Sequence, residues 1–278
     1  MTPKHSHRIK FNRAQEHLKD LKVHIADWRQ SEAHSFRLEP DPSSPEHCLL
    51  KGRAAPIPHE DITPILGDAI QNLRASLDHI VFALVEKHVG RPLEHKVAKI
   101  CEFPIVGGND KVTGHKQFLE KKIVDPQFLS QDARTEIERL QPYHGEMPSR
   151  LNAKGVVVPI ENAISKLNYL SNVDKHRSLH VVVAYTGGVT WNPKIPNSTT
   201  SKSGVTTFGG NPMERGTPIL RLPVELIDRS HEVEVDIKKS LEVAFRHGPA
   251  WTEDVEEVLA GISHFLIVRV FPALEPLL

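Results

Sequence analysis

The sequence predicts an α+β fold, mainly a helical bundle with a small antiparallel sheet from the C-terminal half. Three observations predict it. Apolar residues recur at steps of three and four over several long segments, as in amphipathic helices. Apolar and polar residues alternate over parts of the C-terminal half, as in half-buried strands. Helices and strands follow each other without a regular β-α-β order, which argues against a doubly wound sheet.

Composition excludes several classes of protein. The 278 residues carry 35 Lys and Arg against 35 Asp and Glu, so the strong basic excess of indiscriminate nucleic-acid binders is missing. With 39% hydrophobic residues, the chain can bury a core. No run approaches the roughly 20 apolar residues of a membrane span, and the N-terminus lacks a signal peptide's apolar stretch. Two cysteines cannot build a disulfide framework, so we expect a cytoplasmic location.

Residues 7–34 predict the first long helix, because apolar residues recur there at alternating steps of three and four: Phe11, Ala14, Leu18, Leu21 and Ile25. Residues 35–55 predict a hairpin around the string D-P-S-S-P, whose prolines exclude a helix. A second long helix is expected over 61–88, with Thr63 as N-cap and Pro64 in the first turn.

The middle of the chain predicts shorter elements. A short strand is expected over 100–105, followed by helices over 114–122 and 131–140. The next helix is expected over 160–176, with an apolar face that includes Leu167 and Leu170. We expect this helix to pack directly against the helix at 61–88.

The C-terminal half predicts the sheet. Strands are expected over 179–185, 219–222 and 233–245, the last bent or divided, and 186–217 reads as a loop rich in Gly, Pro, Ser and Thr. A closing helix is expected over 252–270, stopped near Pro272. We expect one α+β domain over 1–278, with a helical part at about 5–177, a strand-rich part at about 178–250 and the closing helix.

The familiar catalytic strings are missing from the sequence. It contains no G-x-G-x-x-G after a strand, no G-x-x-x-x-G-K-[ST], no H-E-x-x-H and no G-x-S-x-G. No Cys and His spacing is typical of zinc sites, so we expect no metal and no cofactor. The pair His5 and His7 is expected to lie in a flexible terminus.

One string points to chemistry. Arg74-Ala75-Ser76-Leu77-Asp78-His79 resembles the Arg-x4–6-His motif of HEPN ribonucleases. The resemblance implies a metal-independent RNase, in which Arg74 holds the scissile phosphate and His79 moves protons as the 2′-hydroxyl attacks. HEPN motifs usually place Asn, Asp or His after the arginine, where this chain has Ala75. The five-residue step also turns Arg74 and His79 about 140° apart on an unbroken helix.

The same helix allows a structural interpretation. Asp68, Asn72 and His79 lie within about 40° of each other, opposite the apolar stripe. Arg74 and Asp78 are four residues apart and can form an ion pair. Asp174 falls near the apolar line of its helix, so it is expected inside with a partner, either Arg74 or a backbone group. The basic residues that follow it complement the negative end of a helix: Lys175, His176 and Arg177.

Longer strings resemble a family of uncharacterised bacterial proteins over roughly residues 5–185. They are G-D-A-I-Q-N-L-R-A-S-L-D-H at 67–79, F-P-I at 103–105, Q-P-Y at 141–143 and L-S-N-V-D-K-H-R at 170–177. We know of no established activity for that family, so this resemblance implies no chemistry.

Two hypotheses therefore stand. The first is a HEPN-like, metal-independent RNA-cleaving or RNA-binding protein, in phage defence or as a toxin. Its catalytic residues are Arg74 and His79, supported by the following residues: Asn72, Asp78, Asp174, Lys175, His176 and Arg177. The second is a non-catalytic binding or assembly protein in which these residues form a buried network. RNA is the expected partner under the first hypothesis. No membrane partner is expected, and a homodimer or a protein partner is left open.

Overall fold

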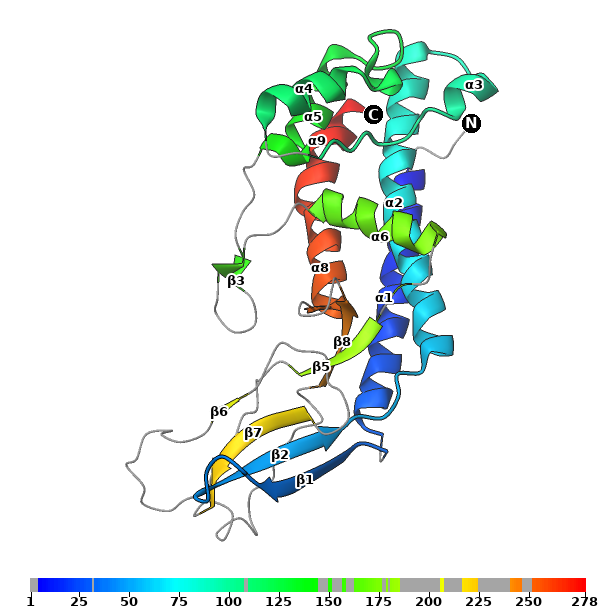
Figure 1. The fold of residues 1–278 in the computed structure, drawn as a ribbon. Coiled ribbons are helices and arrows are strands. Elements are labelled where there is room, and N and C mark those ends of the chain that lie inside the picture. Colours follow the sequence, from blue (N-terminus) through cyan, green and yellow to red (C-terminus); the bar gives the residue numbers. More distant parts are fainter. Residues whose placement is uncertain are drawn as a thin grey trace. The chain divides into compact units, whose positions relative to one another are not determined.

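A computed structural model of the chain gives an α+β fold, which confirms the predicted class (Figure 1). It describes residues 5–31, 33–107, 110–144, 150–151, 157–158, 163–176, 179, 181–185, 206–207, 217–224, 241–246 and 252–278.

The chain divides into two compact units built from segments far apart in the sequence. Unit 1 comprises Met1–Leu21, Thr63–Leu179 and Val258–Leu278, and unit 2 comprises Lys22–Ile62 and His180–Glu257. The expectation of one domain over the whole chain stays a prediction.

Four helices form the main helical framework: α1 (Ser6–Arg29), α2 (His59–Val89), α6 (Ala163–His176) and α8 (Val255–Phe265). The shorter α-helices are α3 (His95–Ala98), α4 (Lys111–Leu119), α5 (Gln131–Arg139) and α9 (Phe271–Leu274). Single 3-10 turns are η1 (Lys122–Val124), η2 (Pro142–His144) and η6 (Glu275–Leu277), and η5 (Leu266–Val270) is a π-helix.

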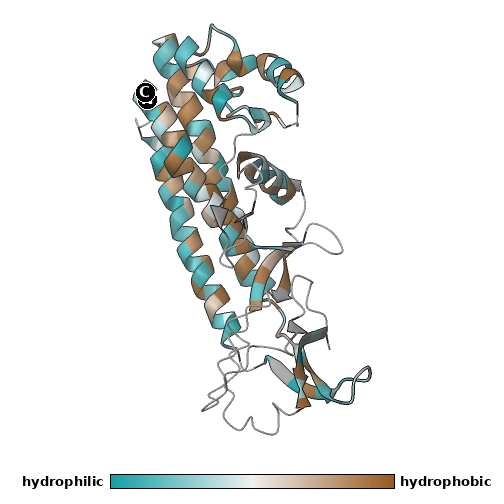
Figure 2. Cartoon of the chain, turned by 90° about the vertical axis from the view of Figure 1, so that its left-hand side faces the viewer, coloured by the Kyte–Doolittle hydropathy of each residue, from teal (hydrophilic) through white to brown (hydrophobic). Residues whose placement is uncertain are grey.

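Helices α2 and α6 of unit 1 contact each other. Ser171 and Asp174 of α6 are hydrogen-bonded to Gln71 of α2, so the two helices are direct neighbours, as expected. The apolar side chains expected at this contact are all buried: Leu73, Leu77, Ile80, Leu167 and Leu170. Figure 2 shows hydrophobic residues alternating with hydrophilic ones around the long helices, as an amphipathic pattern requires.

The strands are antiparallel throughout the described sheets. One sheet of unit 2 has the order β1 (Ser35–Pro40), β2 (His47–Arg53), β7 (Thr217–Pro223) and β6 (Thr206–Thr207). The other has the order β5 (Val181–Tyr185), β8 (Leu241–Arg246) and β9 (Thr252–Asp254). In unit 1, β3 (Arg150–Leu151) pairs with β4 (Val157–Val158). The predicted hairpin at 35–55 is confirmed, and it adds two N-terminal strands to a sheet that was expected from the C-terminal half alone.

Helix α1 ends at Arg29, earlier than the expected residue 34. The carbonyl of Trp28 would have to accept from the N–H four residues later for the helix to continue. It is instead bonded to Ser31 N at 3.0 Å and to Nε2 of His34 at 2.7 Å. The His34 ring also accepts from Ala55 N, so it ties the end of the helix to the segment after β2.

The expected strand over 100–105 is wrong, since residues 101–107 form no regular secondary structure. The closing helix also differs from expectation. Residues 252–254 pair with β8 as β9, and the helix starts at Val255 after Asp254, whose carboxylate accepts from Glu257 N. Helical structure then continues past Pro272, because a proline is tolerated in the first turn of α9.

Within the described part of the chain, one stretch, Val255–Leu277, is long and apolar enough to cross a membrane by length and composition. Of its most apolar window, 39% is buried inside the fold. The cytoplasmic location stays a prediction. The expected loop at 186–217, apart from 206–207 and 217, and the strand residues 233–240 lie outside the described residues.

Leu77→Ala is expected to lower the free energy of unfolding by about 2–5 kcal/mol, because it leaves a cavity where α2 meets its neighbours. Ile9→Ala is the matched control: Ile9 is 58% exposed on α1, so a change within about 0.5 kcal/mol is expected. Denaturant unfolding of both variants measures the difference. Equal stabilities would contradict the packing described here.

Candidate functional site

The string at 67–79 divides into two faces of α2. Gly67, Gln71, Arg74 and Asp78 follow each other at steps of four, three and four, so they lie along one stripe of the helix. This stripe contacts α6 and the segment at 101–107. His79 belongs to a second stripe, which faces α1. The candidate residues are therefore not gathered around one point.

Arg74 and Asp78 hold the backbone of Phe103, and we call this pair the Phe103 clamp. Arg74 Nη2 lies 3.1 Å from Asp78 Oδ1, which confirms the expected ion pair, and donates to the Phe103 carbonyl at 3.1 Å. Asp78 Oδ1 accepts from Phe103 N at 2.8 Å. The pair thus satisfies both polar groups of one residue, as a neighbouring strand would do.

The arginine of the Phe103 clamp is buried, whereas the Asp78 side chain is 26% exposed. Arg74 is only 8% exposed, and its Nη1 atom is buried without a hydrogen-bond partner. Burial raises the pKa of Asp78, although the Arg74 charge and the Phe103 N–H both lower it. The Lys175 charge also lowers this pKa, while the Lys175 side chain itself is exposed. A guanidinium this enclosed has little surface to offer a ligand.

Gln141 of the Q-P-Y string also forms hydrogen bonds with the backbone of the segment at 101–107. Its Oε1 atom accepts from Val106 N at 3.0 Å, and its Nε2 atom donates to the Pro104 carbonyl at 2.9 Å and to the Ile137 carbonyl at 3.0 Å. The strings F-P-I and Q-P-Y are therefore joined by hydrogen bonds. Side chains therefore satisfy backbone groups of Phe103, Pro104 and Val106, which in a strand would bond to a neighbouring strand.

Asp174 binds Gln71 and not Arg74, which corrects the expected ion pair. Gln71 Nε2 donates to Asp174 Oδ2 at 2.8 Å and to the Ser171 carbonyl at 3.2 Å. A Cβ on Gly67 would lie 2.7 Å from Asp174 Oδ1, so the glycine permits this close approach. Arg74 lies three residues beyond Gln71 and seven beyond Gly67, about 4.5 Å and about 10 Å along the helix axis, and contacts Phe103 instead.

His79 occupies the other stripe of α2. Its Nδ1 atom is buried without a hydrogen-bond partner, and burial lowers its pKa, with the positive charges of Lys10 and His7 acting in the same direction. Asn72 is half-buried and donates to the Asp68 carbonyl of its own helix. Arg74 and His79 are thus directed at different neighbours. The His176 side chain and Arg177 lie outside the described residues.

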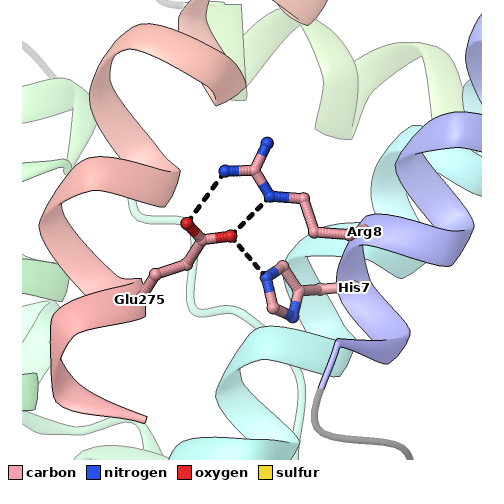
Figure 3. Close-up of polar contacts among 3 residues, drawn as sticks. All are labelled: His7, Arg8 and Glu275. Atoms are coloured by element: carbon pink, nitrogen blue, oxygen red, sulfur yellow. Dashed lines mark hydrogen bonds and ion pairs between the residues drawn. The ribbon is translucent and has the colours of Figure 1, made fainter.

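A second polar cluster joins the N-terminal helix to the C-terminal turn (Figure 3). Glu275 accepts from Arg8 Nε at 2.5 Å and from Arg8 Nη2 at 2.8 Å, and lies 2.8 Å from His7 Nε2. The Arg8 guanidinium lies 4.2 Å from the centre of the Phe271 ring. His7 is fully buried, which corrects the expected flexible terminus. No local pattern predicts this cluster, because Glu275 is 268 residues from His7.

Acid–base properties of this cluster follow from its contacts. The two Arg8 hydrogen bonds lower the pKa of Glu275 to about 2, with the His7 contact adding to the effect. Burial lowers the pKa of His7, and the hydrogen bond to Glu275 opposes it. An open hollow of about 460 Å³ beside the cluster is lined by His5, Arg8, Glu275 and Leu278. Arg8 and Glu275 satisfy each other there, so we assign the hollow no ligand.

Comparison with protein-family models, curated proteins and solved structures finds no match to this chain. Within the described residues, no group of three or more His, Cys, Asp or Glu side chains is placed to hold a metal ion.

Unit 1 is expected to lose stability as the pH falls below 6.5. The pKa of His7 is lowered from 6.5, so the unfolded chain takes up a proton that the folded chain resists. Glu275 has the same effect at lower pH. Its contribution to the stability of unit 1 is complete above pH 4.5 and is lost as the pH falls toward 2. His7→Gln should therefore flatten the fall in Tm between about pH 7 and about pH 5.

The control for this experiment is His264→Gln, which replaces an exposed histidine of α8. Its Tm should follow the pH as the wild type does. If His7→Gln folds at pH 7 and keeps the full wild-type pH dependence, His7 does not contribute in the way proposed.

Proposed function

We propose that the chain is a non-catalytic binding or assembly protein, and that the Phe103 clamp is part of its framework. One observation carries the proposal. The Arg74 guanidinium, the group that would have to grip a scissile phosphate, is 8% exposed and bound to Asp78 and to the Phe103 carbonyl. Breaking those contacts would leave the buried Phe103 carbonyl without its partner and would remove the cation that balances the Asp78 carboxylate.

The distribution of the candidate pair supports the same conclusion. In general acid–base catalysis the proton-transferring group must lie within hydrogen-bond reach of the reacting atoms. The pKa of His79 is lowered by the charges of Lys10 and His7 of α1, whereas Arg74 contacts Asp78 and Phe103. One phosphate would have to reach both sides of α2. The arrangement suits a helix that holds two different neighbours.

The HEPN-like, RNA-directed hypothesis, with its role in phage defence or as a toxin, stays a prediction. Its chemistry needs no metal, because the attacking group is the RNA's own 2′-hydroxyl. Cleavage would therefore persist in EDTA and would leave 2′,3′-cyclic phosphate or 3′-phosphate ends. These products separate it from contaminating metal-dependent nucleases.

The decisive experiment incubates the purified chain with single-stranded and structured RNA in EDTA. We expect no cleavage, since Arg74 is buried and its guanidinium is bound to Asp78 and to the Phe103 carbonyl. The opposite result would be cleavage that leaves cyclic phosphate ends and falls by roughly 10²–10⁴-fold in a folded His79→Ala variant. That result, with a similar loss in Arg74→Lys, would replace our proposal with the ribonuclease.

The structural role makes a prediction of its own. Asp78→Ala removes the acceptor for both Arg74 and Phe103 N, so the free energy of unfolding should fall by about 3 kcal/mol. Asn72→Ala is the matched control on the other stripe, where the side chain bonds only to its own helix, and should change stability by about 0.5 kcal/mol or less. Denaturant titration measures both. Similar values for the two variants would remove the clamp from the framework.

A further inference from the structure

Helix α4 carries a surface that neither the Phe103 clamp nor the core uses. Its outer face is made by Val112, Lys116 and Leu119, which lie opposite the buried Gly114 and Phe118. Val112 is 78% exposed and Leu119 is 55% exposed. Three more exposed lysines lie in the helix or just after its end: Lys111, Lys121 and Lys122. We call these six residues the α4 outer face.

The α4 helix is held firmly, so this face has a fixed direction. Asp110 caps its N-terminus by accepting from Val112 N and Thr113 N. A Cβ on Gly114 would lie 2.3 Å from Cγ of Tyr143, so the inner side of the helix packs as closely as a glycine allows. The apolar residues of the outer face cannot turn inward without breaking this contact.

The lysines of the outer face are not neutralised by the described part of the fold. No hydrogen bond or ion pair joins their side chains to another described residue, whereas Lys51 pairs with Glu39 and Arg139 with Glu136. Residues 111–122 contain one carboxylate, Glu120, so the local charge is three positive (four Lys minus one Glu) in a chain of zero net charge. The neighbouring His115 is paired with Glu138 of α5.

Exposed apolar side chains among unpaired lysines suit one class of partner best. Lysine is depleted in protein–protein interfaces, which favour aromatic residues and arginine. Single-stranded nucleic acid is usually bound on stacking aromatic rings, and the outer face has none. An anionic lipid surface attracts lysines to its headgroups and accepts apolar side chains just below them.

We propose that the α4 outer face is a peripheral docking site for a membrane surface rich in anionic lipid. The lysines supply attraction to the headgroups, and Val112 and Leu119 enter the boundary between headgroups and acyl chains. This departs from the expectation of no membrane partner, which rested on the lack of a spanning run. Peripheral docking needs no spanning segment. The proposal goes beyond the function of the Phe103 clamp and does not depend on it.

Four lysines and two apolar side chains make a weak, reversible and salt-sensitive site. Each lysine near an anionic surface contributes about fivefold to the partition coefficient at low ionic strength. The attraction shortens to a range of about 8 Å at physiological ionic strength. Binding should therefore be clear at low salt and fall steeply as salt is added.

The test is co-sedimentation of the full chain with vesicles of phosphatidylcholine alone, or with one-third phosphatidylserine. Wild type should bind only the phosphatidylserine vesicles. The double variant Lys121→Glu/Lys122→Glu should lower the partition coefficient by about tenfold or more. Val112→Ser/Leu119→Ser should lower it several-fold while leaving the charge unchanged. Unchanged circular dichroism and Tm exclude unfolding as the cause.

The matched control is Lys19→Glu/Lys22→Glu, which reverses two exposed lysines of α1 and should bind as wild type does. Three results overturn the proposal. The first is that wild type fails to sediment with phosphatidylserine vesicles at low salt. The second is that both outer-face variants bind as well as wild type. The third is binding of the outer face to an acidic peptide such as polyglutamate without binding to vesicles, which would assign the face to an acidic protein.

Discussion

A buried peptide segment that pairs with no strand must find its hydrogen-bond partners among side chains, because unpaired backbone groups are costly away from water. Residues 101–107 of this chain meet that requirement. The backbone N–H and carbonyl of Phe103 are bonded to Asp78 and Arg74. Gln141 accepts from the N–H of Val106 and donates to the carbonyl of Pro104. Helix α2, α5 and the segment between them are held together by these few polar contacts.

The stripe that makes the Phe103 clamp also explains how α2 serves two neighbours at once. At one end, Gly67 removes a side chain so that Asp174 of α6 can come close, and Gln71 binds that carboxylate. Two turns further, Arg74 and Asp78 reach the segment at 101–107. Gln71 and Arg74 contact different segments at different positions along the helix axis, Asp174 of α6 and Phe103. Asp174 and Arg74 therefore do not form a pair.

The local patterns were enough to predict the presence of α2, the hairpin of β1 and β2, and the contact of α2 with α6, because each depends on periodicity or turn residues. The expected N-cap at Thr63 was wrong, since α2 begins at His59 and Pro64 lies inside it. The segment at 100–105 was predicted as a strand because its apolar residues resemble one. The pattern could not reveal that its partners are side chains of α2 and Gln141. The expected pairing of Asp174 with Arg74 was wrong for a similar reason: the pattern of one helix does not give its axial register against another, and that register places Gln71 at Asp174.

The cluster of His7, Arg8 and Glu275 lay beyond any local pattern, because its members come from opposite ends of the sequence. The Arg74 and Asp78 pair, in contrast, follows from a spacing of four on one helix and was predicted. The spacing did not predict whether the Arg74 guanidinium faces solvent or the interior. A four-residue ion pair looks the same on a solvated face and against a buried segment, and only the contact with Phe103 separates the two.

These contacts give a structural role to residues of the strings that resemble an uncharacterised bacterial family. Arg74, Asp78, Phe103, Gln141 and Asp174 all come from them, and all five are engaged within unit 1. Residues that hold a framework together are constrained by packing as strongly as residues that perform chemistry, so such strings do not by themselves mark a catalytic centre. Lys175, within one of these strings, is exposed, and the four lysines of the α4 outer face lie outside the strings.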